Sequence, residues 1–245
     1  VTAPPLRHSP ADGAVIRVEA VSKVFGHGQA AVPALDRISL EVQRGQFVCL
    51  VGASGCGKST LLHLLAGLDS PTSGTVAVKG RTGLMFQEAA LFPWLTVAGN
   101  VSLALRLRGV PRRERPPLVE SLLELVHLEG FGARRPHELS GGMRQRVALA
   151  RALAQDADVL LMDEPFGSLD AMTRDLLHAE LERLWTERRF TVLFVTHNVR
   201  EAVRLADRVL VLTSRPGRVG AGFDVRIPRP RRIETPAVSA LAGEI

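Results

Sequence analysis

The strongest constraint on the fold of this chain is a glycine-rich run that separates an apolar stretch from a helical pattern. Residues 47–51 (FVCLV) are apolar throughout, residues 52–59 read GASGCGKS, and leucine and alanine dominate as far as Leu68. An apolar run of this length is typical of a strand that is buried on both faces of a parallel sheet. The sequence therefore predicts a strand, a tight loop and a helix, which is the beginning of an α/β core.

The glycine-rich run also has the spacing G-x-x-x-x-G-K-[S/T], which is typical of loops that bind phosphate groups. Glycines at this spacing let backbone N–H groups surround an anion, and the helix that follows adds partial positive charge. We expect Lys58 to reach the β- and γ-phosphates of a nucleotide and the Ser59 hydroxyl to ligate Mg²⁺. The cofactor-binding residues predicted from this segment are Gly52, Ser54, Gly55, Cys56, Gly57, Lys58, Ser59 and Thr60.

Short apolar runs recur along the chain and alternate with helical patterns. The runs that are apolar throughout suit a buried parallel sheet, and the partly alternating runs suit a half-exposed antiparallel layer. The stretch from about 88 to 140 has no convincing strand pattern and is predicted to be a helical insertion. The predicted strands are 15–18, 38–42, 47–51, 75–78, 159–162, 191–195 and 209–212.

The run VLLMDE at residues 159–164 ends in two carboxylates, Asp163 and Glu164. Ligands of α/β proteins bind at the carboxyl edge of the sheet, where these side chains are expected to lie. We expect Asp163 to hold Mg²⁺, directly or through water, and Glu164 to orient and polarise the attacking water. Apolar runs that end in acidic residues are common, so the pair is informative only together with the phosphate loop upstream.

Residues 139–146 read LSGGMRQR and open another helical pattern. Ser140, Gly141 and Gly142 would present a hydroxyl and free backbone N–H groups to an anion. An ordinary helix N-cap uses the same residue types, so this run alone leaves both interpretations open.

The order of these motifs resembles that of the nucleotide-binding subunits of ATP-binding cassette (ABC) transporters, and the resemblance extends over nearly the whole chain. It implies an α/β P-loop NTPase fold with a mixed sheet core, an antiparallel β subdomain and an inserted α-helical subdomain. We accordingly predict one nucleotide-binding domain at residues 14–225, with the helical subdomain at about 88–154 inserted in a RecA-like core. The proline-rich ends, 1–13 and 226–245, are predicted to be flexible or irregular.

The resemblance also assigns roles to single residues. Gln87, in LMFQE, matches a glutamine that contacts the metal and the water, and His197, in FVTHN, matches a histidine that contacts the γ-phosphate. Phe25, in VSKVFG, matches the aromatic residue that stacks on adenine; the family's usual residue is tyrosine, and phenylalanine keeps the π-face. Asp170, in SLD, matches the family's D-loop and is counted with the cofactor-binding residues. The implied catalytic residues are Glu164, His197 and Gln87, and the implied Mg²⁺ ligands are Ser59, Gln87 and Asp163.

A single chain of this family carries only half of each ATP site. The resemblance implies that Ser140 faces the phosphate loop of a second nucleotide-binding subunit, so that a homodimer closes on two ATP molecules. The segment 88–103 (EAALFPWLTVAGNVSL) follows Gln87 and carries aromatic residues around Pro93. Such a segment either packs into the core or forms a partner groove. The resemblance implies a groove that receives a transmembrane permease subunit.

Phrases such as MFQEAALFPWLTVAGNV and LLMDEPFGSLDAMTR are similar to those of importers of nitrate, sulfonate and taurine. This likeness implies uptake of a small anion at the cytoplasmic face of the inner membrane, where the chain is peripheral. An extracytoplasmic solute-binding protein is then an indirect partner. An exporter-type ATPase would share every catalytic residue and remains an alternative. The other alternative is a soluble ABC ATPase that acts on nucleic acid or the ribosome, although the chain has no extended heptads and one cassette only.

Composition agrees with a globular protein that is soluble or peripheral and not integral to a membrane. No uncharged stretch reaches the ~20 apolar residues that a spanning helix needs, and no apolar secretory signal is expected. The net charge of +6 comes mostly from arginines spread along the chain, so we predict no nucleic-acid partner. The two cysteines, Cys49 and Cys56, lie in an apolar strand-to-loop segment and are predicted to be reduced.

Overall fold

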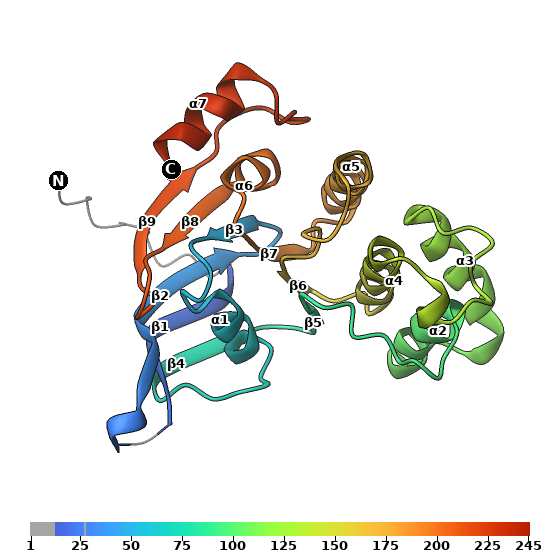
Figure 1. The fold of residues 1–245 in the computed structure, drawn as a ribbon, viewed down its shortest axis with the longest axis horizontal. Coiled ribbons are helices and arrows are strands. Elements are labelled where there is room, and N and C mark those ends of the chain that lie inside the picture. Colours follow the sequence, from blue (N-terminus) through green and yellow to red (C-terminus); the bar gives the residue numbers. More distant parts are fainter. Residues whose placement is uncertain (1–12, 27) are drawn as a thin grey trace. The chain divides into compact units, whose positions relative to one another are not determined.

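The computed structural model describes residues 13–26 and 28–245, and the chain divides into two compact units (Figure 1). The first unit contains the described residues up to Gly80 and resumes at Arg189–Ile245, whereas the second unit is Arg81–Arg188. The second unit is therefore an insertion in the first. Among the described residues, every helix is too short or too polar to cross a lipid bilayer.

One sheet of the first unit is antiparallel and has the strand order β2-β1-β4. In β1, Ile16 and Val18 are buried while Arg17 and Glu19 are exposed, which is the alternation of a sheet with one covered face. On the open face, Arg17 Nε donates to Glu41 Oε1 of β2 at 3.0 Å. The strands are β1 (Ala14–Phe25), β2 (Val32–Gln43) and β4 (Ser73–Val78).

The other strands of the first unit run in the order β7-β3-β8-β9, with the first three parallel and β9 antiparallel to β8. Every residue of β3 and β7 is buried, as the uninterrupted apolar runs predict. Burial raises the pKa of the Cys49 thiol in β3. The elements are β3 (Phe47–Val51), β7 (Thr191–Thr196), β8 (Arg208–Leu212), β9 (Val219–Asp224), α1 (Lys58–Leu65), α6 (Val199–Leu205) and α7 (Pro236–Glu244).

The second unit combines a pair of parallel strands with four α-helices (Figure 1). Helix α2 packs against α3 and α4, and α3 also contacts α4. These three helices fall within the segment 88–154, which the sequence predicts to be helical. The elements are β5 (Thr82–Met85), β6 (Val159–Asp163), α2 (Val97–Leu107), α3 (Arg115–Leu125), α4 (Gly141–Ala154) and α5 (Ala171–Arg188).

The prediction that residues 226–245 are irregular is wrong for the last part of this segment, which forms α7. Pro236 occupies the first turn of α7, where a proline has no hydrogen bond to lose. Val238 is fully buried, and α7 packs against α6. The proline content therefore marked the start of a helix. Residues 1–12 of the predicted N-terminal end lie outside the described residues.

Candidate functional site

The predicted phosphate loop connects β3 with α1 and depends on glycine. Gly55 (φ +76°) and Gly57 (φ +97°) adopt left-handed backbone, which residues with a Cβ atom rarely adopt. A Cβ atom at Gly57 would lie 2.5 Å from Cδ2 of Leu35 and 2.9 Å from the carbonyl oxygen of Ala34. Both the conformation and the available space therefore require glycine where the loop enters α1.

Lys58 is the first residue of α1 and is only 5% exposed. Its Nζ donates to the carbonyl oxygens of Gly52 at 2.8 Å and Ala53 at 3.0 Å. The ammonium group is therefore held inside the loop, next to the positive end of the α1 dipole, where an anion is stabilised. Ser59 and Thr60 follow on the first turn of α1 and are half-buried.

Ser54 and Cys56 occupy the same loop in different ways. Ser54 is exposed, whereas Cys56 is fully buried with its Sγ 4.0 Å from Lys58 Nζ. A Cβ atom at Gly52 would lie 2.8 Å from this Sγ, so the thiol packs directly against the loop backbone. The thiol of Cys56 therefore supports the loop from within.

Phe25 ends β1 and is 44% exposed. The Nζ of Lys23 lies 5.1 Å from the centroid of the Phe25 ring. Lys23 is itself held by Asp69, at 2.7 Å between Nζ and Oδ1. The exposed ring can stack on an aromatic base, and the anchored cation adds an attractive contact on the ring.

His197 lies in the two-residue connection between β7 and α6, and its side chain is exposed. Asn198 caps α6, since its side chain accepts from the Glu201 N–H at 3.2 Å. The Asn198 N–H donates to Thr196 Oγ1 at 3.0 Å, and the Thr196 hydroxyl donates to the Glu201 carboxylate. The backbone at His197 is therefore set by the end of β7 and the beginning of α6.

The predicted acidic pair lies at the carboxyl end of β6, as its position after an apolar run predicts. Asp163 is the last residue of β6 and is buried, and the half-buried Glu164 follows with φ +44°. Left-handed backbone at a residue with a side chain costs about 1–2 kcal/mol and is often found at functional sites. Because Met85 of β5 pairs with Met162 of β6 in parallel register, Gln87 emerges at the same edge as the two carboxylates.

Helix α4 holds the segment that begins at Gln87 through two side chains, Gln145 and Arg151, that belong to no predicted motif. Gln145 Nε2 donates to the Gln87 carbonyl oxygen at 3.0 Å. Arg151 donates from Nη1 to the Ala90 carbonyl at 2.7 Å and from Nη2 to the Ala89 carbonyl at 2.9 Å. The sequence offered no signal for these contacts, since any polar residue on a helix could face solvent.

The run that contains Ser140 caps and begins α4. Ser140 Oγ accepts from the Met143 N–H at 3.2 Å, which is the ordinary N-cap interaction that the sequence left open. Ser140 and Gly141 are both exposed, so the cap also presents its hydroxyl region to the surface. A Cβ atom at Gly142 would lie 3.1 Å from Cδ2 of Leu169, which places the predicted D-loop beside this helix start.

Asp170 caps the next helix, α5. Its Oδ1 accepts from the Thr173 N–H at 2.9 Å. Hydrogen bonds from the backbone and hydroxyl of Thr173 lower the pKa of the Asp170 carboxyl from its usual value. The carboxylate therefore stays ionised at neutral pH. The residue is also exposed.

The segment 88–103 presents aromatic residues at the surface and is held by hydrogen bonds from one of its own buried side chains. Trp94 is 67% exposed and stacks at an angle on Phe92, with ring centroids 5.3 Å apart. Asn100 is fully buried and makes three hydrogen bonds, accepting from Phe92 N at 2.8 Å and donating to the carbonyls of Phe92 at 3.2 Å and Thr96 at 3.0 Å. Of the two interpretations left open by the sequence, core packing does not describe Trp94.

The predicted magnesium ligands offer the donor atoms that this ion prefers. Ser59 of the first unit offers a hydroxyl, and Gln87 and Asp163 of the second unit offer an amide and a carboxylate. Across residues 13–26 and 28–245, no group of three or more His, Cys, Asp or Glu side chains is placed to hold a metal ion. The chemistry of these residues fits Mg²⁺ that is bound together with a nucleotide.

Comparison with known proteins decides the family. Residues 35–167, more than half of the chain, match the ABC transporter family model. The chain belongs to the ABC transporter family. An uncharacterized ABC transporter ATP-binding protein of Methanocaldococcus jannaschii is 47% identical over 224 residues, which cover 88% of this chain and 84% of that protein.

Two further relatives of this ABC protein carry names that state a transported solute. A nitrate import ATP-binding protein of Synechocystis sp. is 46% identical, over 87% of this chain and 83% of the relative. An aliphatic sulfonates import ATP-binding protein of Burkholderia ambifaria is 48% identical, over 97% of this chain and 72% of the relative.

Solved structures confirm the predicted ABC ATPase fold. A dimeric ATP-binding cassette in a post-hydrolysis state, bound to ADP and Pi, matches with a TM-score of 0.79 at 32% identity. A dimeric bacterial ABC transporter cassette matches with a TM-score of 0.80 at 33% identity. Each match covers 87% of this chain and the whole of the solved chain.

Proposed function

We propose that this chain is the ATP-hydrolysing subunit of an ABC importer for a small anion such as nitrate, a sulfonate or taurine. The observation that carries the proposal is that the nitrate and sulfonate import relatives match 87% and 97% of a chain whose nucleotide-binding motifs are complete. These relatives favour an importer over the exporter-type and soluble alternatives.

In the proposed site, residues of the first unit bind the nucleotide. Phe25 stacks on adenine, and the phosphate loop with the start of α1 receives the β- and γ-phosphates. Lys58 exchanges its bonds to the Gly52 and Ala53 carbonyls for bonds to phosphate oxygens, which are charge-assisted and stronger. Gly55 and Gly57 keep the loop in the conformation that permits this approach.

Hydrolysis requires a base and groups that hold the γ-phosphate. Glu164 accepts a proton from water as the water oxygen bonds to the γ-phosphorus and the bond to the ADP oxygen breaks. His197 holds the γ-phosphate, and Gln87 orients the water. Ser59, Gln87 and Asp163 would hold Mg²⁺, which would supply charge neutralisation at the phosphate oxygens.

A second copy of the chain completes each site. The start of α4, with Ser140 and Gly141 exposed and Gly142 half-buried, faces the nucleotide of the partner copy, and Asp170 lies in the same interface. The dimeric state of the two solved cassettes supports this assignment. Binding of two ATP molecules closes the dimer, and hydrolysis reopens it.

The motion passes to a permease through the segment 88–103, whose exposed Trp94 and Phe92 suit a partner groove. The chain itself would sit peripherally at the cytoplasmic face of the inner membrane. An extracytoplasmic solute-binding protein delivers the anion to the permease and meets this chain only indirectly. Solute selection therefore belongs to the other subunits.

The transport part of the proposal is tested by affinity purification of the tagged chain from gently solubilised membranes. We expect a polytopic permease to co-purify, with an anion-binding protein encoded nearby. Recovery of ribosomes or DNA instead would overturn the importer assignment while leaving the ATPase assignment intact.

The ATPase part is tested separately with Lys58→Ala, which removes the cation that meets the phosphates. We expect tight ATP binding and hydrolysis to be lost, whereas Lys79→Ala, at an exposed lysine, keeps both. Normal phosphate release by the Lys58→Ala protein would refute the phosphate-loop assignment.

A further inference from the structure

Helix α6 is short, and His197 lies directly before its N-cap residue. It has seven residues, and helices of this length are marginal in water without tertiary contacts. Its N-cap is Asn198, so the backbone of His197 continues directly into the helix. Contacts that hold α6 in place therefore also hold the backbone of His197 in place.

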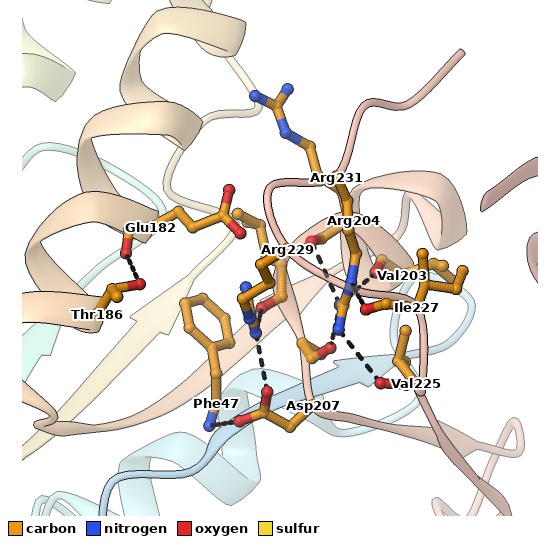
Figure 2. Close-up of polar contacts among 12 residues, drawn as sticks. Phe47, Glu182, Thr186, Val203, Arg204, Asp207, Val225, Ile227, Arg229 and Arg231 are labelled. Atoms are coloured by element: carbon orange, nitrogen blue, oxygen red, sulfur yellow. Dashed lines mark hydrogen bonds and ion pairs between the residues drawn. The ribbon is translucent and has the colours of Figure 1, made fainter. Parts of the chain in front are cut away.

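A buried arginine of the C-terminal segment holds the far end of α6 (Figure 2). Arg231 is 5% exposed, and its Nη1 donates to the carbonyl oxygens of Val203 at 2.9 Å, Arg204 at 3.4 Å and Ala206 at 2.5 Å. The last carbonyls of a helix lack intrahelical partners and carry the negative end of the dipole. One guanidinium group supplies both the missing donors and the matching charge.

A second arginine covers the remaining carbonyl and extends the anchor to the sheet (Figure 2). Arg229 Nη2 donates to the Leu205 carbonyl at 2.5 Å and to Asp207 Oδ1 at 2.9 Å. Asp207 Oδ2 accepts from the Phe47 N–H of β3 at 3.0 Å. All four carbonyls of residues 203–206 thus have an arginine donor, and the anchor reaches a fully buried strand.

The same buried arginine, Arg231, also closes the C-terminal segment on itself. Its Nε donates to the Ile227 carbonyl at 2.7 Å, and its Nη2 donates to the Val225 carbonyl at 3.2 Å. These bonds fold the segment that follows β9 around one side chain. A segment that served only as a solvated basic tail would leave its arginines exposed.

Helix α7 packs against α6 and borders a pocket at the beginning of α6. Ser239, Ala242 and Gly243 of α7 line a pocket of about 430 Å³ together with residues 197–200, including His197. The C-terminal segment therefore holds the last turn of α6 through its arginines, and α7 borders a pocket beside the first turn.

We infer that residues 225–244 form a brace that positions His197 for hydrolysis, with Arg231 as its main positioning residue. The inference rests on the proposed role of His197 and deepens it. The brace acts on the hydrolysis step and not on ATP binding, because Lys58 and the phosphate loop are held by their own local contacts.

The test compares Arg231→Met with Arg232→Met in the full chain. The second variant is a matched control, since Arg232 is adjacent and exposed. We expect Arg231→Met to lower kcat by about 10- to 100-fold, as a small misplacement of a catalytic group does. ATP affinity, measured by equilibrium titration, should stay within about twofold of the wild-type value, which is a negligible change in binding free energy. Arg231→Lys, which keeps one charged donor, is expected to restore part of kcat and serves if the methionine variant does not fold.

A double-mutant cycle with His197→Ala separates positioning from a general structural role. If Arg231 acts through His197, Arg231→Met causes no further loss of single-turnover hydrolysis in the His197→Ala background. An equal loss in both backgrounds, or a parallel loss of ATP affinity, overturns the inference and leaves the proposed function standing. Unchanged hydrolysis by His197→Ala alone instead overturns the role of His197 in the proposed function.

Discussion

Arg151 of α4 is the side chain whose removal should most directly loosen the segment between Gln87 and the exposed aromatic pair. Its two donors occupy the carbonyls of Ala89 and Ala90, and its guanidinium carbon lies 6.0 Å from the centroid of the Phe92 ring. Arg151 is half-buried, and the desolvation of its guanidinium lowers its pKa. Hydrogen bonds from a partly desolvated guanidinium are stronger than those from a surface arginine. The perturbation is Arg151→Met, which keeps the aliphatic volume and removes every donor.

The expected increase in opening of the segment follows from the hydrogen bonds that Arg151→Met removes. Hydrogen bonds from a charged donor contribute about 1.5–3 kcal/mol each, and the exposure of Ala90 lets water replace one of the two. A net local loss of about 2 kcal/mol remains, which raises the population of the open segment about 30-fold. Ala90 has φ +43°, and release of this backbone strain adds to the tendency to open.

Native-state hydrogen exchange read out by mass spectrometry measures this opening peptide by peptide. We expect faster exchange in Arg151→Met for the peptide that spans residues 88–95, with little change in α1 or β3. The matched control is Arg146→Met, which removes an arginine of the same helix that donates to the carbonyls of Val126 and His127. Wild-type exchange at 88–95 in Arg151→Met, or equal acceleration there in both variants, would refute the reasoning.

Two further predictions concern the nucleotide site. The Glu164→Gln protein cannot accept the proton from water, so it should bind ATP, hydrolyse it very slowly and accumulate as a dimer. Light scattering at saturating Mg-ATP measures the dimer, and a monomer there would contradict the shared site. Gly57→Ala should destabilise the protein in urea denaturation by at least about 1 kcal/mol more than Gly67→Ala and should abolish ATP binding. Both glycines have positive φ, but a Cβ atom at Gly57 would meet Leu35 and Ala34 whereas one at Gly67 would enter open space, so equal effects of the two substitutions would show that space is irrelevant there.

Elements with a strong local pattern were predictable, and elements that depend on a neighbour were not. The uninterrupted runs 47–51 and 191–195 predicted β3 and β7, because a strand covered on both faces needs apolar residues at every position. Strand β9 (VGAGFD) is rich in glycine and has no such pattern. It becomes a strand through its antiparallel pairing with β8, which supplies the hydrogen bonds that its own sequence does not specify.

The residues of the candidate site also divide into those marked by a local sequence pattern and those that depend on distant contacts. The phosphate loop, the Ser140 cap and the carboxylates after β6 were visible in the sequence because their chemistry needs particular residues at fixed short spacings. Their supports were not visible, since Gln145 and Arg231 act on backbone carbonyls 58 and 28 residues away. Any backbone carbonyl can accept such a bond, so no residue pattern marks the partner.

By itself, the sequence determined the order of strands, loops and helices that brings phosphate-binding groups to the ends of buried strands, because short-range sterics and burial decide that order. The tertiary structure alone decided that the basic C-terminal segment is folded, that α7 packs against α6, and that Trp94 is exposed while Asn100 is buried. These outcomes depend on which distant carbonyl groups still lack a donor and which apolar surfaces are still uncovered when the rest of the chain has folded. No single sequence position carries that information.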